Sequence, residues 1–480
     1  MKNLALMLLI FICVQTRVLS NSKKIELPQY KFKVGQMLIY NSTNETKGSN
    51  SSSGSKIQTQ FWVWQKNPNG SSRIIICRTL KNYHILEDSI RKEDEPQKTW
   101  AYCDLFPDGR ITENVSLQNF NPSQYFIPLP SDTVIVQPVR NSGDSTIIHS
   151  MEIGSTKPIY ISNGSRGWER FDSINQERTH YQLENKNLTD SIWTVRITKQ
   201  TPFDTIYILS SQSLVYINLK RGLPIKKESE ALQGYGYSAG KTSALTTLDS
   251  IKPFDTLSFK PFINELMTYF QNESTYNQIL DKVEYNTPDA NSLLASAENI
   301  LNNALKTTND STIKVLLNDD INNHEQIKNS LREDSLWFAK TINKKAAEWK
   351  LKDLSEKIHT LKQYRGKIVV LDFWYRGCPW CIRAMPMINQ IAEHFKDLPV
   401  IVFGMNVDKN KDDALFVADK LRLIYPSLQA SGIDKQYEVT GFPTLFIIDK
   451  KGIVRDAHIG YSPDLGVKVM KKIESLLEKK

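Results

Sequence analysis

Two cysteines separated by two residues, Cys378-Pro379-Trp380-Cys381, stand between a strongly apolar run and a segment with helical spacing of its apolar residues. The run Ile368-Val369-Val370-Leu371 predicts a buried strand that ends at about Phe373. The chain then delivers Cys378 to the first turn of a helix, where unpaired backbone N–H groups and the helix dipole favour a thiolate over a thiol. A strand, a cysteine pair and a helix in this order therefore indicate an α/β layer that places reactive cysteines at the start of the helix.

The spacing of the two cysteines predicts redox chemistry. Residues i and i+3 lie about one turn apart on the same helix face, so Cys378 and Cys381 can close a small disulfide ring and reopen it. Pro379 fits the first turn, because the N–H that it lacks has no intrahelical partner there. A zinc site is the alternative, but it needs a second ligand pair, which neither Cys77 and Cys103 nor the 7 scattered histidines supply. We expect no metal, and no cofactor other than the redox-active disulfide.

The first 20 residues have the features of an export signal. Lys2 gives a positive start, an apolar run of 11 residues extends from Leu4 to Val14, and a cut is expected before about Asn21. The run is short for a bilayer span, so residues 1–20 are predicted to be a cleaved signal peptide. An uncleaved N-terminus that holds the protein at the membrane is the alternative. In either case the protein is expected to be exported, which suits disulfide chemistry.

Three compositional zones follow the signal, as a chain of 480 residues leads one to expect. Residues 21–250 show period-two alternation and turn signals, which predict an antiparallel all-β domain. Its Ser- and Asn-rich tract, Asn41 to Ser55, is expected to be a mobile hairpin loop. Residues 251–343 have helical spacing and predict a helical module or linker, and residues 344–480 alternate strands with helices, which predicts an α/β fold with a mixed sheet.

Charge and the remaining cysteines add two expectations. The 61 Lys and Arg are interspersed with 52 Asp and Glu and form no large basic cluster, so nucleic acid is not an expected partner. Cys77 and Cys103 fall in expected strands of an exported domain, and the favoured hypothesis is a structural disulfide between them. A second redox pair and two free buried thiols are the alternatives.

Motifs around the cysteine pair recur together in one known family. They are Asp372-Phe373-Trp374, Ala384-Met385-Pro386, Val439-Thr440-Gly441-Phe442-Pro443-Thr444 and Asp449-Lys450-Lys451-Gly452. With the cysteines, they resemble the thioredoxin superfamily, and more narrowly its TlpA/ResA-like exported thiol–disulfide oxidoreductases. The narrower match rests on Tyr364-Arg365-Gly366-Lys367 and on the Met-Pro after the cysteines. The resemblance covers roughly the last 130 residues and implies a thioredoxin-like domain over residues 344–480.

The resemblance implies a role for each matching residue. Cys378 is the nucleophile and Cys381 the resolving thiol, and Asp372 is a buried carboxyl, with a pKa raised by burial, that exchanges a proton with Cys381. Pro443 is a cis-proline that presents the backbone of Phe442 to an extended substrate. A solvated Asp372 and a trans Pro443 are the alternatives. The other implied substrate-binding positions are Trp374, Trp380 and Gly460.

Two departures from the family pattern bear on the thiolate and on the acid. Arg376 and Gly377 precede the first cysteine where many thioredoxins carry a tryptophan, and Arg376 is expected to favour the thiolate further. Gly404 stands where thioredoxins place a lysine near the buried carboxyl, so Asp372 is expected to titrate higher. The Pro-Trp pair between the cysteines leaves the redox direction open.

The leading hypothesis is an exported thiol–disulfide oxidoreductase that acts on protein thiols and disulfides, as a reductase, in the periplasm or cell envelope of a bacterium. The resemblance implies a membrane electron-donor protein of the DsbD/CcdA kind as its partner. The alternatives are a disulfide oxidase or isomerase, and an envelope binding or scaffold protein whose thioredoxin-like domain serves as structure.

Overall fold

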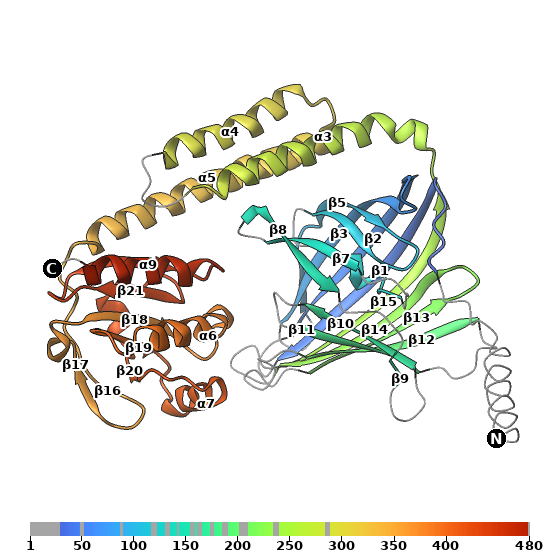
Figure 1. Ribbon diagram of the computed structural model, residues 1–480. Helices are drawn as coiled ribbons and strands as arrows, with labels where there is room; N and C mark the ends of the chain where they lie inside the picture. The colour runs from blue at the N-terminus through green and yellow to red at the C-terminus, as the bar shows by residue number, and fades with distance from the viewer. Residues whose placement is uncertain are drawn as a thin grey trace, which may run out of the picture.

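The computed structural model describes three parts of the molecule: a large antiparallel sheet, long helices beside it and a C-terminal α/β domain (Figure 1). The predicted signal peptide, residues 1–20, lies outside the described residues. No helix in the described part of the chain is long and apolar enough to cross a membrane. The described residues are 29–48, 52–86, 90–116, 122–129, 135–141, 144–153, 159–160, 166–172, 177–184, 191–200, 210–233, 240–283 and 289–478.

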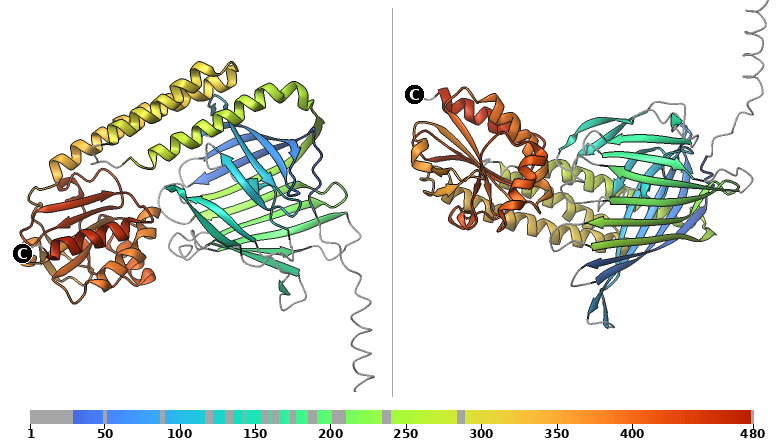
Figure 2. Two further views of the ribbon diagram at one scale, coloured as in Figure 1. Left: turned by 45° about the horizontal axis from the view of Figure 1, so that its top comes forward. Right: turned by 90° about the horizontal axis from the view of Figure 1, so that it is seen from below.

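Within the described residues, the N-terminal part is an antiparallel sheet of 13 strands, strongly curved in Figure 1 and Figure 2. Its strands are β1 (Gln36–Gly48), β2 (Ser52–Lys66), β3 (Ser72–Leu86), β4 (Ile90–Glu93), β5 (Gln97–Leu105), β6 (Ile111–Ser116), β9 (Ile159–Tyr160), β10 (Arg166–Asp172), β11 (Glu177–Leu183), β12 (Ile192–Gln200), β13 (Ser210–Asn218), β14 (Leu223–Gln233) and β15 (Gly240–Pro253). The order is β6-β5-β3-β2-β1-β15-β14-β13-β12-β11-β10-β9, with β4 beside β3. A separate hairpin joins β7 (Ile135–Asn141) and β8 (Asp144–Ile153).

The expectation of a mobile loop over residues 41–55 is wrong for the residues that the structure describes. β1 pairs with β2 out to Lys47 opposite Ser52, and it pairs with β15 on its other side. The Asn44 amide donates to Ser55 Oγ over 3.1 Å, and the hydroxyls of Ser42 and Thr246 lie 2.8 Å apart. Polar side chains here satisfy one another across strands, which stabilises pairing without an apolar pattern.

Strands β2, β3 and β5 are buried on both faces of the sheet. Phe61, Ile76 and Cys103 belong to a core on one face, which spans most strands of the sheet. Their neighbours in sequence, which include Trp62 and Cys77, belong to a second core between the opposite face and the helices. Side chains therefore alternate between the two faces of the sheet, as in any strand, but here both faces are covered by a core.

The hypothesis of a Cys77–Cys103 disulfide is wrong, because both cysteines are buried and unbonded. The register of β3 and β5 places Cys77 opposite Trp100 and Cys103 opposite Ile74. Positions 74 and 77 are an odd number of residues apart, so the two thiols point to opposite faces of the sheet and cannot meet. Burial raises the pKa of Cys77 to about 11, and it raises that of Cys103 further, so neither is a ready nucleophile.

We expect both thiols to be free in the oxidised protein. Labelling with N-ethylmaleimide after denaturation without reductant should modify Cys77 and Cys103 but leave Cys378 and Cys381 unlabelled, as read by mass spectrometry of peptides. Prior reduction is the control, and after it N-ethylmaleimide should label all four of these cysteines. A cross-linked peptide that joins Cys77 to Cys103 would contradict the structure.

Three helices link the sheet to the C-terminal domain: α3 (Thr256–Leu280), α4 (Ala290–Thr307) and α5 (Ser311–Thr341). Asp255 caps α3 and Asp310 caps α5, each through its carboxylate to backbone N–H groups. The 31 residues of α5 correspond to about 46 Å. Its first turns pack in the core against the sheet, and Trp337 and Phe338 near its end lie in the core of the C-terminal domain. One continuous helix therefore takes part in both cores.

The C-terminal domain has a mixed sheet of five strands in the order β20-β19-β18-β21-β22, as the alternating pattern predicts. β18 pairs with β19 in parallel and with β21 in antiparallel. Its elements are β16 (Lys350–Lys352), β17 (Ile358–Thr360), β18 (Ile368–Trp374), α6 (Pro379–His394), β19 (Val400–Asn406), α7 (Lys411–Leu421), β20 (Ser427–Gln429), α8 (Ile433–Gln436), β21 (Thr444–Ile448), β22 (Val454–Ile459) and α9 (Leu465–Glu478).

The central strand β18 is buried along its whole length and separates two cores. Ile368 and Val370 pack with residues of α6 and α9. Leu371 and Phe373 face the other way, toward the end of α5. Asp372 and Trp374 share the face of Ile368 and Val370, because side chains alternate along a strand.

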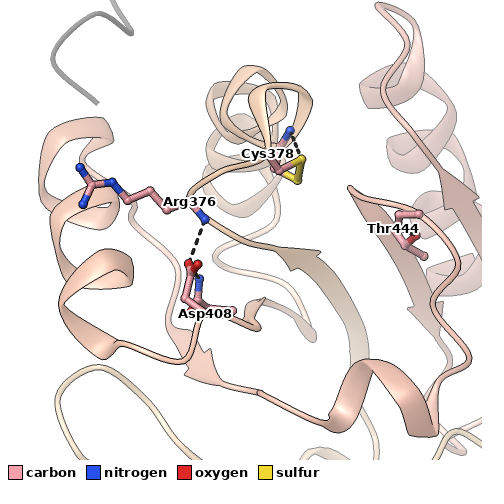
Figure 3. The surroundings of a disulfide bond; sticks show 7 residues. Arg376, Cys378, Asp408 and Thr444 are labelled. Carbon is pink, nitrogen blue, oxygen red and sulfur yellow. Dashed lines mark hydrogen bonds between the residues drawn. A yellow bond between two sulfur atoms is a disulfide. The ribbon is translucent and has the colours of Figure 1, made fainter. Parts of the chain in front are cut away.

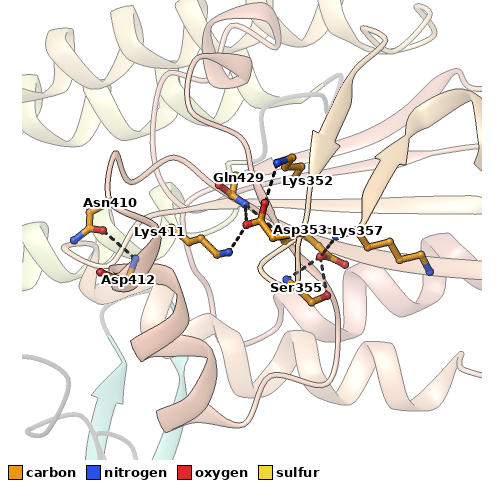
Figure 4. A network of polar contacts seen from close by, with 9 residues as sticks. Lys352, Asp353, Ser355, Lys357, Asn410, Lys411, Asp412 and Gln429 are labelled. Carbon is orange, nitrogen blue, oxygen red and sulfur yellow. Dashed lines mark hydrogen bonds and ion pairs between the residues drawn. The ribbon is translucent and has the colours of Figure 1, made fainter.

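A polar network ties α7 to the turn between β16 and β17 (Figure 4). The Glu356 carboxylate pairs with Lys352 over 2.9 Å, pairs with Lys411 and accepts from the Gln429 amide. These lysines lower the pKa of Glu356 to about 2. Asn410 caps α7 by accepting from the Asp412 N–H. The network fixes the first turn of α7, which packs near the dithiol.

Candidate active site

Cys378 and Cys381 are joined by a disulfide at the N-terminus of α6 (Figure 3). Cys378 is the N-cap residue and Pro379 occupies the first turn, as the sequence predicts. Cys378 Sγ accepts the backbone N–H of Cys381 over 3.1 Å. The same contact, together with the helix dipole, would stabilise a Cys378 thiolate after reduction.

Asp372 lies on β18, on the sheet face that carries α6. It is 1% exposed, and neither of its carboxylate oxygens has a hydrogen-bond partner among the described residues. Burial raises the pKa of Asp372 to about 7. The alternative of a solvated aspartate is therefore wrong. A buried carboxyl that changes its protonation near neutrality is suited to general acid–base work.

The Phe442–Pro443 peptide bond is cis, in agreement with the resemblance. The Thr444 hydroxyl donates to the Gly441 carbonyl over 2.7 Å, and the Pro443 carbonyl accepts the N–H of Gly460 over 2.7 Å. Gly460 has a φ of +83°, and no atom lies within 4 Å of the place where a side chain would begin. The proline loop therefore lies beside open surface that an extended peptide backbone could approach.

Aromatic side chains form the rim of the site. Trp380, between the cysteines, is 51% exposed. Its ring lies 6.1 Å from that of Tyr461, nearly parallel to it, and Tyr375 packs edge-on against Phe442. Sequence reasoning missed Tyr461 and Tyr375, although each directly adjoins a position that it singled out. Trp374 is fully buried in a cluster with both cysteines, so it forms a wall of the site rather than a surface for a protein substrate.

Arg376 does not act on the thiolate as expected. Its guanidinium pairs with Asp413 over 2.9 Å and stacks on Phe416, and Figure 3 shows it directed away from Cys378. Its backbone N–H donates to the Asp408 carboxylate over 2.8 Å. Arg376 therefore connects the loop before the dithiol to α7. The group that would stabilise the Cys378 thiolate is the N-terminus of α6. In the described part of the chain, no group of three or more His, Cys, Asp or Glu could hold a metal ion.

Similarity to known proteins is found for the part of the chain that carries the dithiol. Residues 342–457 match the model of the AhpC/TSA family. The thioredoxin-like protein YneN of Bacillus subtilis is 32% identical over 118 residues, which are 24% of this chain and 69% of YneN. The thiol-disulfide oxidoreductase ResA of Geobacillus kaustophilus is 34% identical over 128 residues, which are 25% of this chain and 71% of ResA. The solution structure of a thiol:disulfide interchange protein from Bacteroides sp. is 23% identical, has a TM-score of 0.26, and is matched over 29% of this chain and 93% of its own.

Proposed function

This chain belongs to the family of ResA-like thiol–disulfide oxidoreductases, and on that premise we propose that it reduces disulfide bonds in client proteins outside the cytoplasm. The observation that carries the proposal is a bonded cysteine pair at a helix N-terminus, on the sheet face where Asp372 is buried and has no hydrogen-bond partner among the described residues. The N-terminal signal features support the location, and the reductive direction is our choice between the two directions that this chemistry allows.

The first step uses the reduced dithiol. The Cys378 thiolate attacks one sulfur of the client disulfide, so that a bond forms between Cys378 and that sulfur while the client disulfide breaks. The other client sulfur leaves as a thiolate. The helix N-terminus favours this attack, because it stabilises the thiolate before the client arrives.

The second step releases the client. The Asp372 carboxylate accepts the proton of the Cys381 thiol, and the resulting thiolate attacks Cys378 Sγ. The intramolecular disulfide forms, the mixed disulfide breaks, and the remaining client sulfur leaves as a thiolate. Two electrons have passed from the dithiol to the client, and the protein is left in the oxidised form. A donor dithiol must then reduce it, and we propose a membrane electron-donor protein of the DsbD/CcdA kind.

The reduction potential of the Cys378–Cys381 pair tests the direction. We expect the full chain, equilibrated in glutathione buffers, to show a potential at or below about −270 mV, the range of a general reductase. A potential near −120 mV would overturn the reductase proposal and make the protein a disulfide donor. Failure of the bond to form in any buffer would favour the binding or scaffold alternative. The Cys77→Ala variant is the control. Cys77 lies in the core between the N-terminal sheet and the helices, so its loss should leave the potential of the Cys378–Cys381 pair unchanged.

A further inference from the structure

Four buried residues lie next to Gly404 on the dithiol side of the central sheet: Trp374, Tyr425 and Ser427, whose side chains approach it, and Asp372, its partner on β18. Asp372 pairs with Gly404 on β19, and Gly404 pairs with Ser427 on β20, so these three positions form one row across three strands. A side chain begun at Gly404 would lie 2.8 Å from Ser427 Oγ, 2.8 Å from Trp374 Nε1 and 3.3 Å from the Tyr425 ring. Two of these distances are shorter than a real side chain allows, so only glycine fits here, and its lack of a side chain lets the Trp374 indole N–H and the Ser427 hydroxyl lie close together beside the strand.

Five polar side-chain atoms of these four residues have no hydrogen-bond partner among the described residues. They are both Asp372 carboxylate oxygens, the indole N–H of Trp374 and the hydroxyls of Tyr425 and Ser427. All four residues are at most 5% exposed. Native proteins rarely leave buried polar groups unpaired, and here five such atoms belong to four neighbouring residues. Since these groups do not pair with one another, a small shared partner would satisfy them, and water is the partner that buried polar groups commonly take.

The charge of Asp372 acts on Tyr425. Burial raises the pKa of Tyr425, and the negative charge of Asp372 raises it further. The phenol therefore remains a proton donor at every pH at which Asp372 titrates. No hydrogen bond joins the two side chains directly, so any donation from the phenol to the carboxylate must pass through an intervening molecule.

We propose that Asp372, Trp374, Tyr425 and Ser427 form a binding site for internal water, and that Tyr425 is a positioning residue that acts on Asp372 through this water. The inference rests on the proposed function, because Asp372 is the proton acceptor of its second step. The hydroxyls and the indole N–H are neutral donors, and they favour the ionised carboxylate without adding a charge. They thereby set the pH at which Asp372 can take the proton of Cys381.

The titration of Asp372 tests the proposal in the full-length oxidised protein. Protein labelled with 13C at aspartate carboxyls is titrated by NMR, and the resonance of Asp372 is the one that the Asp372→Asn variant lacks. Tyr425→Phe removes only a hydroxyl, and we expect it to raise the titration midpoint by about one pH unit, a tenfold change in the protonation equilibrium. Ser427→Ala should shift the midpoint in the same direction.

Tyr437→Phe is the matched control. Tyr437 is also buried, but it lies in the core on the opposite sheet face and donates to the Ala347 carbonyl over 2.8 Å. Its loss should leave the Asp372 midpoint unchanged. A midpoint that Tyr425→Phe and Ser427→Ala both leave unmoved would overturn the proposal.

A measurement on the unaltered protein removes dependence on folding of the variants. The indole proton of Trp374 should show a nuclear Overhauser effect to long-lived water, and its absence would count against the site. Both measurements use oxidised protein without a client. They can therefore support the water site even if the redox potential overturns the reductase proposal. They can also overturn the water site even if the redox potential supports that proposal.

Discussion

Replacing Cys381 by serine is expected to trap clients on the protein. Cys378 keeps its place at the N-terminus of α6, so it can still attack a client disulfide, but no second thiolate can break the mixed disulfide. With a peptide disulfide in excess, close to one peptide per protein should become covalently attached, and turnover should fall to the uncatalysed background. Mass spectrometry of the intact protein without reductant, together with the rate of thiol release, measures both.

Cys378→Ser is the paired variant for this experiment, and it should neither form the adduct nor turn over. Cys77→Ala should behave like the unaltered protein, because Cys77 is buried in the core beside the helices. An adduct that forms equally well in Cys378→Ser and maps to Cys381 would reverse the assigned roles of the two sulfurs.

Much of the active site follows from local sequence. An apolar run, a cysteine at the N-cap and a proline in the first turn specify β18 and the start of α6 within a few residues, because all of these signals act between near neighbours. The cis peptide bond before Pro443 also agrees with the family pattern. Arg376 was misjudged because its partner, Asp413, belongs to α7, and nothing local shows which way the guanidinium turns.

Features that depend on strand register were not predictable. Cys77 and Cys103 each fall in an expected strand, but only the pairing of β3 with β5 shows that their side chains point to opposite faces. The cluster of unpaired polar groups at Asp372 has the same origin. It forms because Gly404 stands between Asp372 and Ser427 in adjacent strands, and the sequence alone does not reveal which residues become neighbours across a sheet.

The link between the two cores was also not foreseen. Helical spacing predicts a module over residues 251–343, but it does not show that α5 continues without a break from the core beside the sheet into the C-terminal core. Trp337 anchors that end, since its indole N–H donates to the Glu438 carbonyl over 2.6 Å. The two ends of one helix therefore belong to two different cores, which helical spacing alone does not reveal.

Asp372→Asn is expected to change how the stability of the C-terminal domain depends on pH. The Asp372 carboxyl has a pKa of about 7 in the folded protein, against about 3.9 in an unfolded chain. Because the folded value is the higher one, the stability from this group is fully present below about pH 4 and is lost as pH rises through 7. The difference corresponds to about 4 kcal/mol, and asparagine does not titrate. Relative to the unaltered protein, the variant should therefore gain about that much in free energy of unfolding between pH 4 and pH 8.

Urea-dependent hydrogen exchange of the β18 peptide, read by mass spectrometry, measures this difference within the full chain. Asp449→Asn is the contrasting control. Burial raises the pKa of Asp449, but hydrogen bonds from Ile453 and Arg455 outweigh it and lower that pKa, so the contribution of Asp449 is present above about pH 4 and is lost as pH falls through its folded pKa. Water around Gly404 would reduce the gain of Asp372→Asn without changing its sign, because hydration favours the charged carboxylate. Parallel pH profiles for the unaltered protein and Asp372→Asn would mean that Asp372 does not titrate between pH 4 and pH 8, and the second step would then need another base.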